Sequence, residues 1–155
     1  MSLAPLSRIV SAEMKVCCDN GAYRKELRPL QESGKADLFK FQYENKNRNV
    51  PNSGLPSKLQ WRDLKNYKWE TIPAETWDEF SGSEKYDQIV AIVGLANHRV
   101  DILHLDSAYK NGCEVFLTND KGDIWSKKEQ LEPALGMRIF HTEEVDECIA
   151  YIAGR

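Results

Sequence analysis

The chain has 155 residues, a formal net charge of −3, and 41% hydrophobic and 29% charged residues. Such values are typical of a globular domain that buries a core without disulfides or structural metals, and the length fits one domain. The acidic balance argues against nucleic-acid attraction over the whole surface, although it permits a local basic patch. No apolar run approaches the ~20 residues of a membrane-spanning helix, so we expect no membrane association.

The four cysteines show neither a Cys-x-x-Cys pair nor the Cys/His spacing of a zinc site. Cys17 and Cys18 are adjacent in an expected strand, where successive side chains point to opposite faces. Together with Cys113 and Cys148 they are therefore expected to be thiols packed as small core residues in a reducing compartment. The N-terminus lacks a basic segment followed by an apolar one, so no secretory signal is expected. These observations predict a cytoplasmic protein.

The first half of the chain begins with a strand and a helix. Residues 15–18 are apolar and precede Asp-Asn-Gly, which predicts a strand that ends in a turn. Residues 22–32 carry apolar side chains at helical spacing and predict a helix. Over residues 37–43 the aromatic side chains Phe39, Phe41 and Tyr43 alternate with Leu, Lys and Gln, which predicts a second strand. Residues 45–57 are rich in Asn, Pro, Gly and Ser and predict a loop.

The rest of the chain alternates further helical patterns with two short apolar strands. Helices are predicted over residues 58–69, 73–80, 83–93, 101–110, 126–135 and 142–153, and strands over residues 113–117 and 137–140. Strands separated by helical segments favour right-handed crossovers and a mainly parallel sheet covered on both faces. We therefore predict an α/β fold, a three-layer α/β/α sandwich, formed by a single domain over residues 14–155 after an N-terminal extension at residues 1–13.

Three aspartates are expected at the carboxyl edge of this sheet, where open parallel sheets bind ligands. Asp19 follows the first strand, Asp120 follows the strand at 113–117, and Asp101 begins a helix, where the helix dipole favours a carboxylate. Three acids at one crevice need a counter-charge, which Mg²⁺ or Mn²⁺ would supply. Simpler roles remain open for each residue: Asp19 as a turn residue, Asp101 as a helix cap and Asp120 as the start of a loop.

Other polar residues near these acids are weaker candidates. Asp106 is rotated by roughly 140° from Asp101 around the helix and is expected to be a surface acid. Asp123 follows Asp120 closely enough to reach the site from its loop. His104 lies one turn after Asp101, where a partly exposed packing role is expected. His98 and His141 have no partner that the sequence identifies.

Several of these residues form a pattern that resembles the PIN-domain family. The match consists of Asp101-Ile-Leu-His-Leu-Asp-Ser-Ala108, then Asn111-Gly112, then Val115-Phe-Leu-Thr118-Asn-Asp120, with Lys15-Val-Cys-Cys-Asp19 similar to the opening strand of the family. The resemblance is good over residues 98–125, fair over residues 14–20 and poor between them. It implies a PIN-like sandwich and Mg²⁺- or Mn²⁺-dependent ribonuclease activity, with catalytic residues Asp19, Asp101, Thr118 and Asp120, the three aspartates being the metal ligands.

Two positions depart from the family pattern. Asn20 stands where the family usually has Thr or Ser after its first Asp. The second acid of the family is usually a Glu that opens a helix after the second strand. Glu44 is the best match and is the fourth candidate for the acidic site, but it lies in a stretch with loop composition. An incomplete set of acids would be compatible with a PIN-like fold that has lost catalysis.

Two further segments offer contacts for RNA. Residues 61–69 combine cationic and aromatic side chains. In a nuclease such side chains can bind single-stranded RNA, the cations at its phosphates and the aromatic rings by stacking on its bases. The alternative is an amphipathic helix whose aromatic side chains pack inward and whose lysines face water, and we favour this interpretation. Arg24, Lys25 and Arg28 follow Asp19 on the next helix and would attract phosphate if they face the crevice. Otherwise they form a solvated face.

Three functional hypotheses follow. The first is a metal-dependent ribonuclease that hydrolyses RNA phosphodiester bonds at the carboxylate cluster, in which Thr118 orients a carboxylate or water. The second is a catalytically inactive PIN-like module that binds RNA or a protein partner. The third is another doubly wound α/β domain in which Asp19 and Asp120 serve a different ligand. Because some PIN domains are toxins, the resemblance would also imply a homodimer and an antitoxin-like protein partner.

Overall fold

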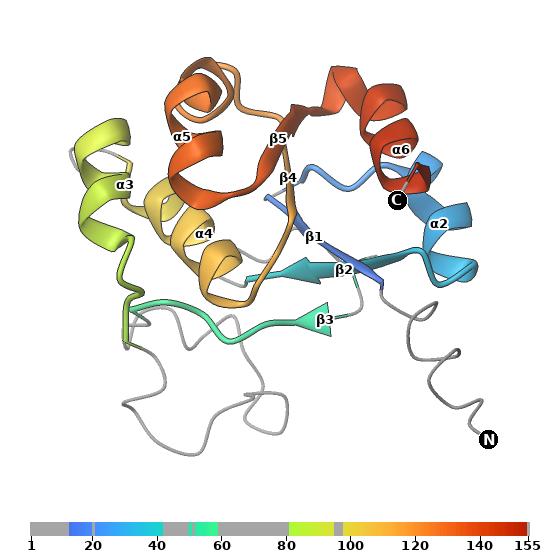
Figure 1. Cartoon of the computed structure of the whole chain (residues 1–155), viewed down its shortest axis with the longest axis horizontal. Helices are drawn as coiled ribbons and strands as arrows, with labels where there is room; N and C mark the ends of the chain where they lie inside the picture. Colours follow the sequence, from blue (N-terminus) through green and yellow to red (C-terminus); the bar gives the residue numbers. More distant parts are fainter. Residues whose placement is uncertain are drawn as a thin grey trace.

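The fold is built on a parallel β-sheet (Figure 1). The computed structural model describes residues 13–19, 21–41, 50, 52–58, 81–94 and 98–154. Within these residues the sheet has five strands in the order β3-β2-β1-β4-β5, and each neighbouring pair is parallel. The strands are β1 (Met14–Cys18), β2 (Ala36–Lys40), β3 (Asn52–Ser53), β4 (Val115–Thr118) and β5 (Arg138–His141). The predicted α/β class and parallel sheet are confirmed, and β1 and β4 are neighbours at its centre.

Helices cover both faces of the sheet (Figure 1). The helices α3, α4 and α5 lie on one face, and α2 and α6 lie on the other. Their bounds are α2 (Arg28–Glu32), α3 (Tyr86–Val93), α4 (Arg99–Lys110), α5 (Lys128–Leu135) and α6 (Val145–Ala153), with single 3-10 turns η1 (Lys25–Leu27), η5 (Trp125–Lys127) and η6 (Thr142–Glu144). This arrangement is consistent with the predicted three-layer sandwich. None of the helices in the described residues has the length and apolarity that crossing a membrane requires.

Alternation along the central strands divides the core between the two faces. Cys17 and Phe116 pack with α3, α4 and α5, whereas Cys18 and Leu117 pack with α2 and α6. All four side chains are fully buried, because both faces of a parallel sheet are covered by helices. The four cysteines are buried thiols, as the sequence predicts, and Cys17 and Cys18 do point to opposite faces.

Several predicted elements differ from the structure at their ends. The helix expected over residues 22–32 begins only at η1 and α2, with Pro29 in the first turn. The loop expected over residues 45–57 contains the short edge strand β3. The prediction of a helix start at Ser83 is close, since α3 begins at Tyr86 and Ser83 Oγ accepts a hydrogen bond from the Lys85 N–H. The helices predicted over residues 58–69 and 73–80 fall almost wholly outside the described residues.

Asp106 is a buried structural acid, so the prediction of a surface acid is wrong. Its carboxylate accepts hydrogen bonds from the hydroxyls of Ser57 and Ser83 and from the Ser83 N–H at 3.0 Å. Directly after α4, the Asn111 side chain pairs with both backbone groups of Leu55, at 2.9 and 2.7 Å. Asp106 and Asn111 therefore hold two distant chain segments, at residues 55–57 and at Ser83, against α4, which helical geometry alone does not reveal.

Candidate functional site

The site lies where the two central strands end. Asp19 directly follows β1, and Asp120 lies two residues beyond β4. The Asp19 N–H donates to the Leu117 carbonyl at 2.9 Å, which continues the β1–β4 ladder to the edge of the sheet. The Asn111-Gly112 stop, with Gly112 at φ +77°, turns the chain from α4 back toward β4. Asp19 and Asp120 therefore lie at the carboxyl ends of adjacent strands, which is the edge of the sheet where the sequence predicts them.

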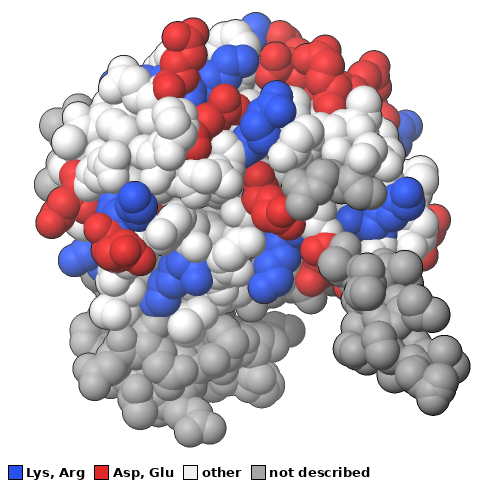
Figure 2. Space-filling model, in the orientation of Figure 1, with Lys and Arg blue, Asp and Glu red and all other residues white. Residues whose placement is uncertain are grey.

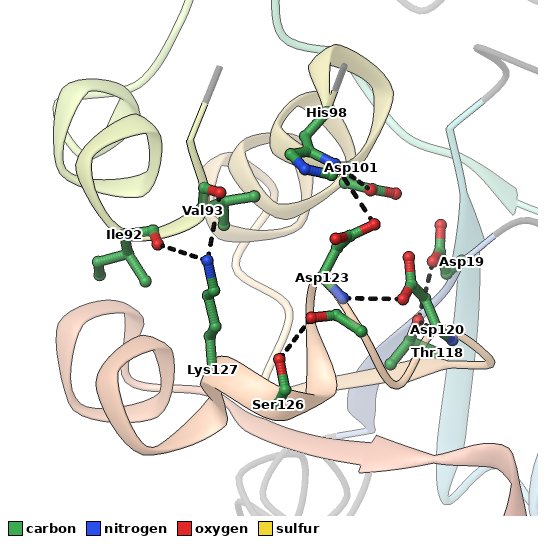
Figure 3. Close-up of polar contacts among 11 residues, drawn as sticks. Asp19, Ile92, Val93, His98, Asp101, Thr118, Asp120, Asp123, Ser126 and Lys127 are labelled. Carbon is green, nitrogen blue, oxygen red and sulfur yellow. Dashed lines mark hydrogen bonds and ion pairs between the residues drawn. The ribbon is translucent and has the colours of Figure 1, made fainter. Parts of the chain in front are cut away.

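Thr118 connects the two strand-end aspartates. Its hydroxyl donates to Asp19 Oδ2 at 3.0 Å and accepts from the Asp120 N–H, also at 3.0 Å (Figure 3). Thr118 is fully buried and Asp19 is 4% exposed, so these hydrogen bonds are shielded from water. The hydroxyl therefore holds the carboxylate of Asp19 and the backbone of Asp120, and its role in catalysis stays a prediction.

Asp101 lies in the first turn of α4, near enough to Asp19, Asp120 and Asp123 to interact with their charges. Burial and, to a smaller extent, the charges of Asp19, Asp120 and Asp123 together raise the pKa of its carboxyl to about 7, whereas His98 lowers it. Like charges at short range oppose each other's ionisation. Near neutral pH the group thus exchanges a proton readily, and a bound cation could take the place of that proton.

His98 and Asp123 are the site residues that sequence reasoning underrated. His98 Nδ1 lies 3.7 Å from Asp101 Oδ2 and 3.3 Å from Asp123 Oδ2. Among the described residues, His98, Asp101 and Asp123 are the group of three whose ligand atoms all lie within 4.8 Å of one another. The signal for His98 is its spacing of three residues before Asp101, which places the two side chains on neighbouring turns at a helix start.

The loop between β4 and η5 is fixed by its own hydrogen bonds. Asp120 Oδ1 accepts from the Asp123 N–H at 2.9 Å, and the Asp120 carbonyl accepts from the Trp125 N–H at 3.2 Å. Lys127 then donates to the carbonyls of Ile92 and Val93 at the end of α3, at 3.2 and 3.4 Å (Figure 3). The loop that carries two of the acids is thus tied to the C-terminal end of α3.

His104 and His141 lie in different surroundings from those expected. His104 is fully buried rather than partly exposed, and its Nδ1 lies 3.8 Å from Asp19 Oδ1. His141 Nδ1 accepts a hydrogen bond from the Glu143 N–H at 3.0 Å and caps η6, so His141 has a structural partner. His104 therefore lies directly behind the site, and His141 serves the fold.

The remaining candidates contribute less to the described site. Glu44, Asn20 and residues 61–69 lie outside the described residues. The Arg24 guanidinium donates to the carbonyls of Gly21 and Tyr23, at 3.1 and 2.9 Å, in the turn that follows Asp19. The Arg24 side chain therefore stabilises this turn, and this structural role does not depend on a contact with phosphate.

The cluster therefore contains four carboxylates and one imidazole, from Asp19, Asp101, Asp120, Asp123 and His98. Carboxylate oxygens and imidazole nitrogens are ordinary protein ligands for divalent cations. An excess of negative charge over one histidine fits a bound cation, which would neutralise it. Comparison of the chain with protein-family models, curated proteins and solved structures finds no significant match.

Proposed function

We propose that this chain is a metal-dependent ribonuclease with a PIN-like fold, hydrolysing RNA phosphodiester bonds at the carboxylate cluster. The observation that carries the proposal is that Asp19 and Asp120 follow the two central strands and are linked through Thr118, and that Asp101 of α4 lies near enough for their charges to raise its pKa. The strand, helix and loop that present these residues are those on which the sequence resemblance to the family rests.

Bound Mg²⁺ or Mn²⁺ would lower the pKa of a coordinated water and stabilise charge on the phosphate. Asp19, Asp101 and Asp120 would hold the ion, because they offer hard oxygen ligands at one edge of the sheet. Thr118 keeps the Asp19 carboxylate in one orientation, so that less freedom is lost on binding. Asp101 would give up its proton to hold the ion, since its pKa of about 7 leaves it largely protonated below neutral pH. Glu44 remains the candidate for a fourth acid.

Single-stranded RNA is the proposed substrate. Figure 2 shows basic side chains interspersed with acidic ones on the face presented there. Contacts with RNA would therefore be local and not spread over a broad basic surface. Arg24 is a candidate for one such contact because it flanks the turn that follows Asp19. An antitoxin-like protein partner, a homodimer and a cytoplasmic location belong to the same hypothesis and rest on the sequence.

The test is cleavage of a labelled single-stranded RNA by the full chain with Mn²⁺ or Mg²⁺, and with EDTA as the metal-free control. Asp101→Asn should abolish cleavage, whereas Asp146→Asn, an exposed acid on α6, should leave it unchanged. Asn at position 101 removes a charge from a crowded site, so this variant is expected to fold. Unchanged cleavage by Asp101→Asn would exclude the mechanism. RNA binding without any cleavage by the unmodified chain would favour the inactive PIN-like module.

A further inference from the structure

The group formed by His98, Asp101 and Asp123 differs in chemistry from the predicted all-carboxylate site. It contributes one imidazole nitrogen and two carboxylate oxygens, all within 4.8 Å of one another. The three side chains are 28%, 22% and 37% exposed, so an ion can reach them without unfolding of the chain. Asp101 is shared between this group and the predicted ligands Asp19 and Asp120.

We propose that His98, Asp101 and Asp123 form a mixed nitrogen and oxygen site that binds a first-row transition dication in preference to Mg²⁺. Mg²⁺ favours carboxylates and water in an octahedral shell, whereas imidazole suits Zn²⁺ and its neighbours in the transition series. The expected order of affinity is therefore Zn²⁺ over Mn²⁺ over Mg²⁺. The inference deepens the proposed function and rests on it for the use of the ion in catalysis.

The two segments that carry these ligands are held in place before any ion binds. His98 precedes α4, and its carbonyl accepts the Ile102 N–H at 3.0 Å, which fixes it one turn from Asp101. Asp123 is held through its own N–H by the Asp120 carboxylate. Lys127 ties its loop to the end of α3 (Figure 3). Ligands fixed by surrounding hydrogen bonds lose little entropy when they bind a metal.

Charge also favours a cation over a simple ion pair at this position. His98 faces Asp101 and Asp123 directly, and Asp19 and Asp120 lie near enough to interact with Asp101. Even a protonated imidazole supplies one positive charge against several carboxylates. A dication bound to the neutral imidazole supplies two and contacts both carboxylates through short bonds.

Ion affinity is measured by calorimetry on the full chain, free of RNA, with Zn²⁺, Mn²⁺ and Mg²⁺ in turn. We expect Zn²⁺ to bind at least about tenfold more tightly than Mg²⁺. His98→Ala should weaken Zn²⁺ binding by about tenfold or more and leave Mg²⁺ binding nearly unchanged, and Asp123→Asn should weaken both. Asp146→Asn serves as the control, since it removes an acid of the same kind from a distant helix.

A second measurement separates the proposed site from binding of Zn²⁺ to the buried thiols. The chain has three histidines, so the imidazole nitrogen resonances can be assigned by single substitution. We expect the Nδ1 resonance of His98 to shift on addition of Zn²⁺ while that of His141, which caps η6, stays in place. A stationary His98 resonance, equal affinity for the three ions, or unaltered Zn²⁺ binding by His98→Ala would each overturn the proposal.

The two proposals fail separately. A chain that binds Zn²⁺ through His98 but cleaves no RNA with any ion contradicts the proposed function and retains the site. A chain that cleaves RNA with Mg²⁺ but shows no His98-dependent ion binding contradicts this inference and retains the ribonuclease.

Discussion

Thr118 donates its hydroxyl hydrogen to Asp19 across 3.0 Å while the same oxygen accepts the Asp120 N–H. One buried side chain thereby links the ends of the two central strands at the point where the candidate ligands gather. A hydroxyl can donate and accept at once, which a carboxylate or a methyl group in its place could not do.

The first prediction concerns this hydroxyl. Thr118→Val keeps the shape of the side chain but leaves the Asp19 carboxylate without its donor, so we expect Mn²⁺ affinity and RNA cleavage to fall by about 10- to 100-fold. Thr118→Ser restores the hydroxyl and should recover most of both. Thermal unfolding followed by circular dichroism checks that the variants are folded. Unchanged Mn²⁺ affinity and cleavage in the Val variant, or no recovery in the Ser variant, would contradict this role of the hydroxyl.

The second prediction concerns the pH dependence of stability. The ordinary pKa of an aspartate is 3.8, and that of Asp101 is raised to about 7. Burial and the charges of Asp19, Asp120 and Asp123 raise this pKa, whereas His98 lowers it. Between these pH values the folded chain holds a proton that the unfolded chain has lost. The contribution of Asp101 to folding is therefore fully present below about pH 4 and declines as pH rises toward 7.

We expect the melting temperature of the metal-free chain to fall more between pH 5 and pH 8 than that of Asp101→Asn, measured by differential scanning calorimetry in EDTA. Subtracting the two profiles removes the titration of other groups. Saturating Mn²⁺ should reverse the trend in the unmodified chain, because the ion displaces the proton and stabilises the folded state. Parallel profiles for the two proteins would show that Asp101 does not hold the proton.

The third prediction concerns the buried carboxylate of Asp106. Asp106→Ala leaves the Ser57 and Ser83 hydroxyls and the Ser83 N–H without their acceptor, so unfolding by urea should require less free energy by about 1–3 kcal/mol. Asp106→Asn keeps one acceptor oxygen and should cost less. Asp87→Ala, an exposed change on α3, serves as the control. A loss no greater than that of the control would contradict the assigned role.

The sequence predicts where Asp19 and Asp120 lie, but it does not predict the contacts of Asp106 and His98. The parallel sheet and the strand-end positions of Asp19 and Asp120 follow from local apolar runs and turn residues, which act over a few positions. The burial of Asp106 depends on Ser57 and Ser83, which lie 49 and 23 residues away. The role of His98 likewise depends on Asp123, brought close by the turn of a loop. Contacts of this range leave no periodic signal in the chain.

The fourth prediction concerns the edge strand β5, which has one side without a neighbouring strand in the described sheet. Glu132 Oε2 accepts the Ile139 N–H at 2.8 Å, and Glu144 Oε1 accepts the His141 N–H at 2.9 Å and the Trp125 indole N–H at 2.8 Å. Carboxylates thus occupy backbone donors that a strand of another molecule could otherwise use. Covering or charging an edge in this way opposes edge-to-edge association.

Replacing Glu132 and Glu144 together by Ala should free both N–H groups of β5 and cause concentration-dependent self-association. Sedimentation velocity over a range of protein concentrations measures it. The matched control replaces Glu129 and Glu147, exposed glutamates on α5 and α6, and should leave the sedimentation coefficient as it is in the unmodified chain. Circular dichroism separates association of the folded double variant from aggregation after unfolding. A folded double variant that sediments like the control would show that other features of the edge, such as the exposed Arg138, prevent pairing on their own.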